Sequence, residues 1–103
     1  MTEQEFRLRA DDALEQARHA LMGPADSEGF ELELQNGVLQ IEFEEPSPTK
    51  FIVSPNAPVR QIWISAMSRS YKLSWSPDAS TFVIDGEPLN DLLQRLVGQF
   101  LAQ

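Results

Sequence analysis

Residues 30–44 contain the pattern that most constrains the fold. Apolar residues alternate with mostly acidic ones in two runs, 30–34 and 39–44, and Asn36-Gly37 lies between the runs. Asn-Gly is the preferred sequence of a tight two-residue turn, and alternation gives a strand one apolar face and one polar face. The pattern therefore predicts a β-hairpin with one side covered by other parts of the chain and the other side in water.

Two amphipathic segments flank the region of predicted strands. Thr2 and Glu5 have the spacing of a helix capping box, and apolar residues then recur at helical spacing as far as Gly23-Pro24, which predicts a helix over residues 3–22. Leucines recur at the same spacing after Pro88, a residue that suits the first turn of a helix. This second pattern predicts a helix that runs to about residue 101.

Further short strands are predicted over residues 50–54, 58–65, 71–75 and 81–84, so that about five to six strands follow one another in series. Such a series favours an antiparallel meander, and both helices can bury their apolar stripes on one face of it. The sequence therefore predicts an α+β fold, a two-layer sandwich, as a single domain over residues 1–103, since 103 residues suffice for one core but not two.

The strand predicted for residues 58–65 carries a large aromatic residue on its polar side. Ile62 and Ile64 share one face, which we assign to the core, whereas Gln61, Trp63 and Ser65 share the other. We therefore expect Trp63 to be exposed on an open sheet surface. A rigid exposed aromatic is a good interface anchor, although an incidental surface residue that covers a neighbouring loop would give the same pattern.

Charge and composition exclude several classes of function. The net charge of −8 disfavours binding to nucleic acid backbones or anionic lipid and favours a cationic partner or a metal ion. Most of the sixteen acidic residues lie within residues 1–45. The chain has no cysteine, which removes disulfides, thiolate ligands and cysteine nucleophiles, and its single histidine lies in no nucleophile–base pattern, so we expect no enzymatic activity.

The sequence also predicts a cytoplasmic location. No apolar run approaches the roughly 20 residues that a membrane span needs. The first residues, Met1 to Glu5, are acidic where a signal or transit peptide would be basic.

Several strings in this order resemble the frataxin family, in particular its bacterial CyaY-type members. The resemblance runs from Glu5-Phe6 to about Leu93. The strings that carry it are Asn36-Gly37-Val38-Leu39 with Ile41 and Phe43, the segment from Pro58 to Ser65, the segment from Tyr71 to Trp75, and Asp85-Gly86 followed by Leu89-Asn90-Asp91-Leu92-Leu93. The concentration of acid in the first helix and first strand adds to the likeness.

The resemblance implies a function. Frataxins bind iron, engage the cysteine desulfurase and the scaffold protein of iron-sulfur cluster assembly, and modulate how fast clusters are made. The resemblance implies that iron binds weakly to surface carboxylates, that Asp12 and Glu15 also contact the partner, and that Gln61 and Trp63 form a second contact surface. The carboxylates concerned are Asp11, Asp12, Glu15, Glu31 and Glu33. From the residues alone, His19 lies one turn after Glu15 and could join a carboxylate site.

The chain departs from the family pattern in places. Positions near the end of the first helix where bacterial relatives often carry acid hold Arg18, His19, Met22, Gly23, Ala25 and Gly29, and Ser74 precedes the second tryptophan where an acid is common. Weaker iron binding is therefore expected. The alternative is a small acidic secretion-type chaperone, which would dimerise and bind an unfolded client, whereas the frataxin reading predicts a monomer in metal-free buffer.

Overall fold

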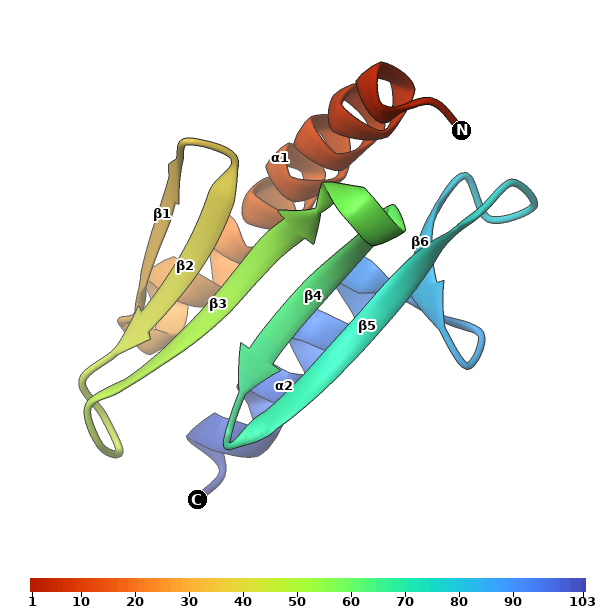
Figure 1. The fold of residues 1–103 in the computed structure, drawn as a ribbon. Helices are drawn as coiled ribbons and strands as arrows, with labels where there is room; N and C mark the ends of the chain where they lie inside the picture. Colours follow the sequence, from red (N-terminus) through yellow and green to blue (C-terminus); the bar gives the residue numbers. More distant parts are fainter.

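The computed structural model describes residues 1–103 and shows a seven-stranded antiparallel sheet with both helices on one face (Figure 1). The strands lie side by side in chain order, β1 to β7. The elements are α1 (Glu3–Glu28), β1 (Glu31–Gln35), β2 (Val38–Phe43), β3 (Thr49–Asn56), the 3₁₀ helix η1 (Ala57–Val59), β4 (Gln61–Ala66), β5 (Arg69–Ser76), β6 (Thr81–Ile84), β7 (Glu87–Pro88) and α2 (Leu89–Leu101). The predicted α+β sandwich and meander are confirmed, and the additional strand is the two-residue β7.

The predicted hairpin is present as β1 and β2. Asn36 and Gly37 form its turn with φ angles of 54° and 76°, the left-handed values that a type I′ turn requires at both central positions. Glu31 lies opposite Glu42 and Glu33 opposite Gln40, so the register places the carboxylates on the face away from the helices. The turn chemistry therefore fixes which side of the sheet is acidic.

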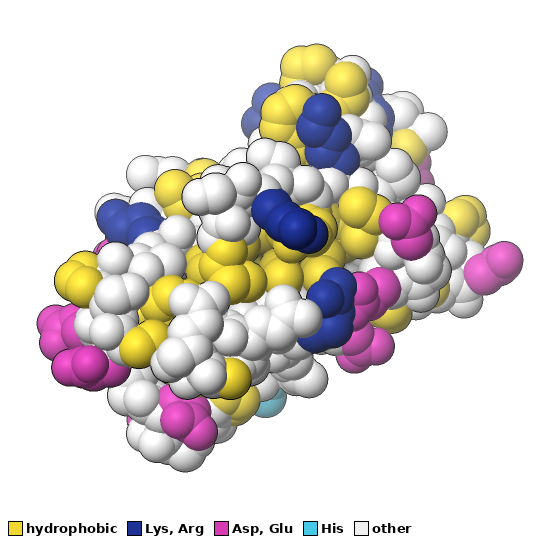
Figure 2. Space-filling view, turned by 90° about the horizontal axis from the view of Figure 1, so that it is seen from below, with side chains coloured by type: hydrophobic (Ala, Val, Ile, Leu, Met, Phe, Trp, Pro, Cys, Tyr) yellow, Lys and Arg dark blue, Asp and Glu magenta, His cyan; other side chains and the backbone are white.

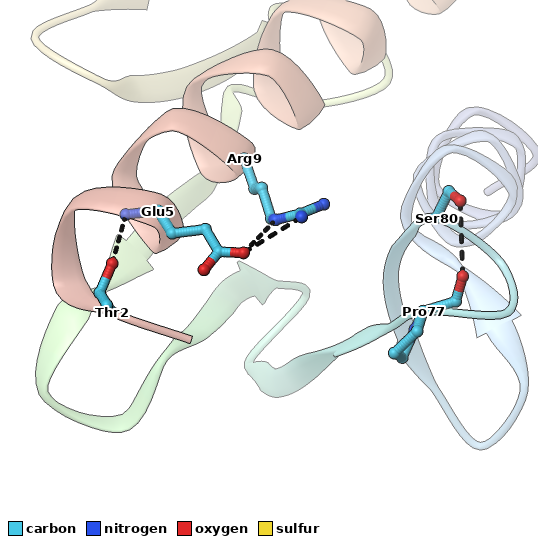
Figure 3. A network of polar contacts seen from close by, with 5 residues as sticks. All are labelled: Thr2, Glu5, Arg9, Pro77 and Ser80. Carbon is cyan, nitrogen blue, oxygen red and sulfur yellow. Dashed lines mark hydrogen bonds and ion pairs between the residues drawn. The ribbon is translucent and has the colours of Figure 1, made fainter.

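Helix α1 begins where the sequence predicted and ends later. The Thr2 hydroxyl accepts a hydrogen bond from the Glu5 amide at 3.0 Å (Figure 3). Gly23 and Pro24 were expected to stop the helix, and this prediction is wrong, because α1 continues to Glu28 with Pro24 inside it. The stop is Gly29, which adopts φ 80° and donates its amide to the Ala25 carbonyl, the usual arrangement of a glycine C-cap.

The strand that carries Trp63 begins later than predicted. Residues 57–59 form η1, and Arg60 then adopts a left-handed conformation with φ 55°. This kink separates Pro58 from the strand, so β4 begins at Gln61 rather than at residue 58. The alternation from Gln61 onward holds as predicted, with Ile62 and Ile64 at 0% and 1% exposure.

The core lies between the sheet and the two helices and contains only hydrophobic residues. Phe6 of α1 packs edge-on against Phe82 of β6, with ring centroids 5.8 Å apart. Phe43, Phe51 and Phe100 form a second aromatic group that joins β2 and β3 to α2. Each fully buried side chain of this size stabilises the fold by roughly 1.5–3 kcal/mol relative to exposure. Neither helix combines the length and the apolar character needed to cross a membrane.

Candidate functional site

Trp63 lies on the open face of the sheet, as predicted, and two neighbours hold its ring. Its indole Nε1 donates a hydrogen bond to Oε1 of Gln61 at 2.9 Å. Gln61 in turn donates through Nε2 to the Ser74 hydroxyl at 3.3 Å on the adjacent strand. Lys72, which pairs directly with Trp63 across the strands, places its ammonium 4.7 Å from the ring centroid. We call Gln61, Trp63, Lys72 and Ser74 the Trp63 patch.

The expectation that Trp63 is exposed needs correction. The structure places its side chain in an intermediate state between buried and exposed. The physical reason is the contact with Lys72 and Gln61, since a cation over the ring face and a partner at the indole nitrogen both remove area from water. The ring is therefore half-buried and fixed in orientation.

Asp11 and Glu15 of α1 and Glu31 and Glu33 of β1 form an acidic surface along one edge of the molecule, which we call the acidic ridge. All four are exposed. Asp11 and Glu15 line a hollow together with Leu34 of β1, so the helix and the strand are adjacent there. Figure 2 shows acidic side chains at the left edge of the view, the side on which β1 and β2 lie, and others on the right of the view.

Asp12 lies apart from the acidic ridge. It lines a cleft on the opposite flank of α1 with Trp75 and Thr81, and its carboxylate accepts a hydrogen bond from Gln16 at 2.8 Å. Successive residues of a helix differ by about 100° in direction, so neighbours in sequence face different sides. Asp11 and Asp12 therefore lie on different surfaces.

Glu15 is engaged by a cation within the ridge. Arg18 donates two hydrogen bonds to its carboxylate, from Nε at 3.1 Å and from Nη2 at 2.5 Å. The hydrogen bond from Arg18 holds the pKa of Glu15 below its ordinary value of 4.5, with smaller electrostatic contributions from Arg18 and His19. One carboxylate of the ridge is thus already paired with a cation from the chain itself.

The remaining predicted metal ligand, His19, is exposed. Nowhere in residues 1–103 do three or more histidine, aspartate or glutamate side chains come close enough to one another to hold a metal ion together. The carboxylates of the ridge are arranged as single residues or pairs on an exposed surface. A cation bound there would keep most of its water ligands.

Sequence reasoning missed three residues of the open face. Lys72 and Ser74 complete the Trp63 patch, and Ile52 is 38% exposed on the same face, opposite Ser65. Alternation along β5 and β3 could have placed all three on the open side. The contact of Lys72 with Trp63 needed the register between β4 and β5, which the sequence does not state directly.

The two surfaces are close but chemically different. Trp63 lies on the fourth strand and the β1 residues of the acidic ridge, Glu31 and Glu33, on the first, roughly 14 Å apart at the usual strand spacing. The ridge can attract cations over a distance, whereas the Trp63 patch offers a flat aromatic group and hydrogen-bonding side chains. One partner with a basic region beside an apolar region could contact both.

Comparisons with known proteins bear on this arrangement. The model of the family described as "Frataxin-like domain" matches residues 1–103. The chain is 33% identical to the iron-sulfur cluster assembly protein CyaY of Pseudomonas aeruginosa, over 92% of this chain and 86% of the relative. It is 30% identical to the CyaY protein of Janthinobacterium sp. strain Marseille, over 96% of this chain and 89% of the relative. A solved frataxin from Psychromonas ingrahamii has the same fold, with a TM-score of 0.67 at 23% identity, over 100% of this chain and 91% of that structure.

Proposed function

The chain belongs to the frataxin-like family, and from this membership we propose that it takes part in iron-sulfur cluster assembly. Relatives that match it over most of their length are named iron-sulfur cluster assembly proteins. In the role that we propose, the chain is an iron-binding regulator or iron chaperone that acts by binding. Its partner is the complex of a cysteine desulfurase with its scaffold protein.

The observation that carries the proposal is the presence of two different surfaces, the acidic ridge at the β1 edge and the Trp63 patch on the open face of the same sheet. The ridge is exposed and steers a basic partner, an effect that increases association rates at low salt. The Trp63 patch is preorganised by the bonds from Trp63 to Gln61 and from Gln61 to Ser74, so association orders few side-chain torsions. Charge thus brings the partner to the surface, and Trp63 fixes its position.

Iron enters this proposal as a cargo held by surface carboxylates. Hard cations take carboxylate oxygens, and the ridge offers them singly or in pairs. Arg18 competes for Glu15 because it already occupies both carboxylate oxygens. Asp11, Glu31 and Glu33 are therefore the principal candidates in the ridge, and Asp12 would bind a separate ion on the opposite flank of α1.

The comparisons favour this reading over the secretion-type chaperone. The frataxin-like family model spans the whole sequence, residues 1–103. No observation on the molecule favours the chaperone class specifically.

A cluster-assembly assay with a purified desulfurase and scaffold tests the proposal. Adding the chain in excess should change the rate of cluster formation. The Trp63→Ala variant should lose most of that change, whereas Val59→Ala, which truncates an exposed side chain in η1, should retain it. A rate that does not respond to the wild-type chain would contradict the proposed role.

The iron part of the proposal has its own test. Titration with Fe²⁺ in the absence of oxygen should perturb NMR amide signals of residues 11–15 and 31–33. The paired variant Glu31→Gln/Glu33→Gln should lose the second group of changes. Glu44→Gln/Glu45→Gln, which removes the same charge in the exposed segment after β2, is the matched control. A spectrum unmoved by stoichiometric iron would contradict iron binding and leave the cluster-assembly assay to decide the rest.

A further inference from the structure

We propose that the free edge of β1 binds an extended basic segment of a partner protein as an additional strand of the sheet. This inference goes beyond the proposed function, because it names a binding mode that uses the backbone and does not depend on iron. β1 is the terminal strand of the sheet, and Figure 1 shows no segment beyond it. Addition of a strand to an exposed sheet edge is a recurrent mode of peptide recognition.

The backbone of β1 leaves two residues unpaired on the outer side. Asn36-Gly37 forms a two-residue turn, so the flanking pair, Gln35 and Val38, is a hydrogen-bonded pair. Antiparallel pairs alternate between bonded and non-bonded. The amides and carbonyls of Leu32 and Leu34 therefore point away from β2, toward the free edge.

The two sheet edges differ in how far they could accept a strand. β7, at the other end, has only two residues, Glu87 and Pro88, and proline has no amide to donate. β1 has five residues, no proline and no bulge in its pairing with β2. Only β1 is therefore long and regular enough to act as a template.

The space beside β1 can hold the inward-facing side chains of an added strand. Two hollows flank the strand on the helix side, one at Leu34 beside Asp11 and Glu15, the other at Leu32 beside Met22. Both leucines are partly exposed, and Met22 is 46% exposed. Every second side chain of an added strand would point into these hollows, and the others would lie beside Glu31 and Glu33 on the open face.

Charge complementarity selects the occupant. The edge is bordered by Asp11, Glu15, Asp26, Glu31 and Glu33, and Arg18 is the cation among them. Because Arg18 is paired with Glu15, the remaining carboxylates favour a strand that carries lysine or arginine. A second copy of this chain would instead place acidic residues against acidic residues, which is destabilising in cross-strand pairs. Charged edges of this kind protect a sheet against self-association.

Hydrogen exchange of backbone amides tests the proposal, with a capped peptide of alternating arginine and valine as the probe. In the free chain, the Leu32 and Leu34 amides should exchange faster than those of Glu31 and Glu33, which bond to β2. Saturating peptide should slow exchange at Leu32 and Leu34 by at least about tenfold, because each gains a backbone hydrogen bond. Protection should change little at Glu31 and Glu33. Peptide binding without this alternation, or no binding at low salt, would overturn the proposal.

Two sets of controls separate strand addition from charge attraction alone. Consecutive amides of an extended peptide point to opposite edges of the strand. N-methylation of one set of residues, the valines or the arginines, should therefore abolish binding, and N-methylation of the other set should leave binding intact. Equal effects of the two sets would overturn the proposal. Glu31→Lys/Glu33→Lys should weaken binding about tenfold or more, and Glu44→Lys/Glu45→Lys should weaken it much less. Protection of Leu32 and Leu34 that rises with protein concentration, without peptide, would identify a second copy as the occupant and also overturn it.

Discussion

The Trp63 patch and the acidic ridge show two ways in which one sheet presents a binding surface. In the patch, Trp63, Gln61 and Ser74 are linked by hydrogen bonds, and Lys72 lies over the ring, so that the geometry exists before a partner arrives. In the ridge, exposed carboxylates lie on two elements, and only Glu15 is held, by Arg18. In the proposed function, the patch determines how a partner sits, and the ridge determines which partners approach.

The largest effect should come from the face of β4 opposite to the patch. Ile64→Ala should lower the free energy of unfolding by about 2–5 kcal/mol, because the side chain is 1% exposed and its loss leaves a cavity. Partner binding by the molecules that remain folded should be unchanged. Urea denaturation followed by circular dichroism measures the first quantity. A loss below about 1 kcal/mol would show that β4 is not anchored in the core as described.

Trp63→Ala should have a smaller effect on stability and a large effect on binding. A fully exposed tryptophan would leave the stability unchanged, but half-burial and the bond to Gln61 predict a loss of about 1–2 kcal/mol. Affinity for the partner complex should fall about tenfold or more, as for an interface anchor. Trp63→Phe, which keeps an aromatic ring and loses the indole donor, should lie between the wild-type chain and Trp63→Ala in both stability and affinity. Wild-type affinity in Trp63→Ala would remove the patch from the interface.

The parts of the fold that were predicted correctly depend on local chemistry. Asn36-Gly37 specified a turn that needs positive φ at both positions, and Thr2 with Glu5 specified the start of α1. The end of α1 was predicted incorrectly because two positions, Gly23-Pro24 and Gly29, both fit local rules for the end of a helix. Pro24 is tolerated within α1, and the left-handed conformation that ends the helix occurs at Gly29.

The site was predicted less completely than the fold, for physical reasons. The half-burial of Trp63 depends on Lys72, which is nine residues away and reaches the ring only through the register of β4 with β5. The η1 turn that delays β4 depends on the left-handed conformation of Arg60, a conformation that is unusual for a residue of this type. The separation of Asp12 from Asp11, by contrast, follows from helical geometry and could have been predicted.

The folded protein should become more stable when a charge is removed from the ridge. Glu31 lies directly opposite Glu42, and like charges in such pairs are destabilising. Glu31→Gln should therefore raise the free energy of unfolding by a few tenths of a kcal/mol, with an upper limit of about 1 kcal/mol. The gain should shrink in high salt, which screens exposed charges. Glu45→Gln, in the exposed segment between β2 and β3, is the control, and a loss of stability in Glu31→Gln would mean that Glu31 has a favourable partner.

The smallest effect concerns the one ridge carboxylate that is held in place. Because Arg18 lowers the pKa of Glu15 in the folded chain, the pair contributes stability above pH 4.5, the ordinary value, and this contribution is lost as the pH falls through the folded pKa. Arg18→Gln should raise the pKa of Glu15 toward 4.5, as measured by NMR titration of the carboxyl carbon, and should barely change the unfolding curve, because the two side chains remain in contact with water, at 33% exposure for Arg18 and 53% for Glu15. Glu87, whose pKa is lowered by Arg95 in the same way, should not move and is the internal reference. The variant also frees Glu15 for a cation, so the iron-induced shifts of residues 11–15 should become larger; smaller shifts would show that Arg18 does not compete with iron in the ridge.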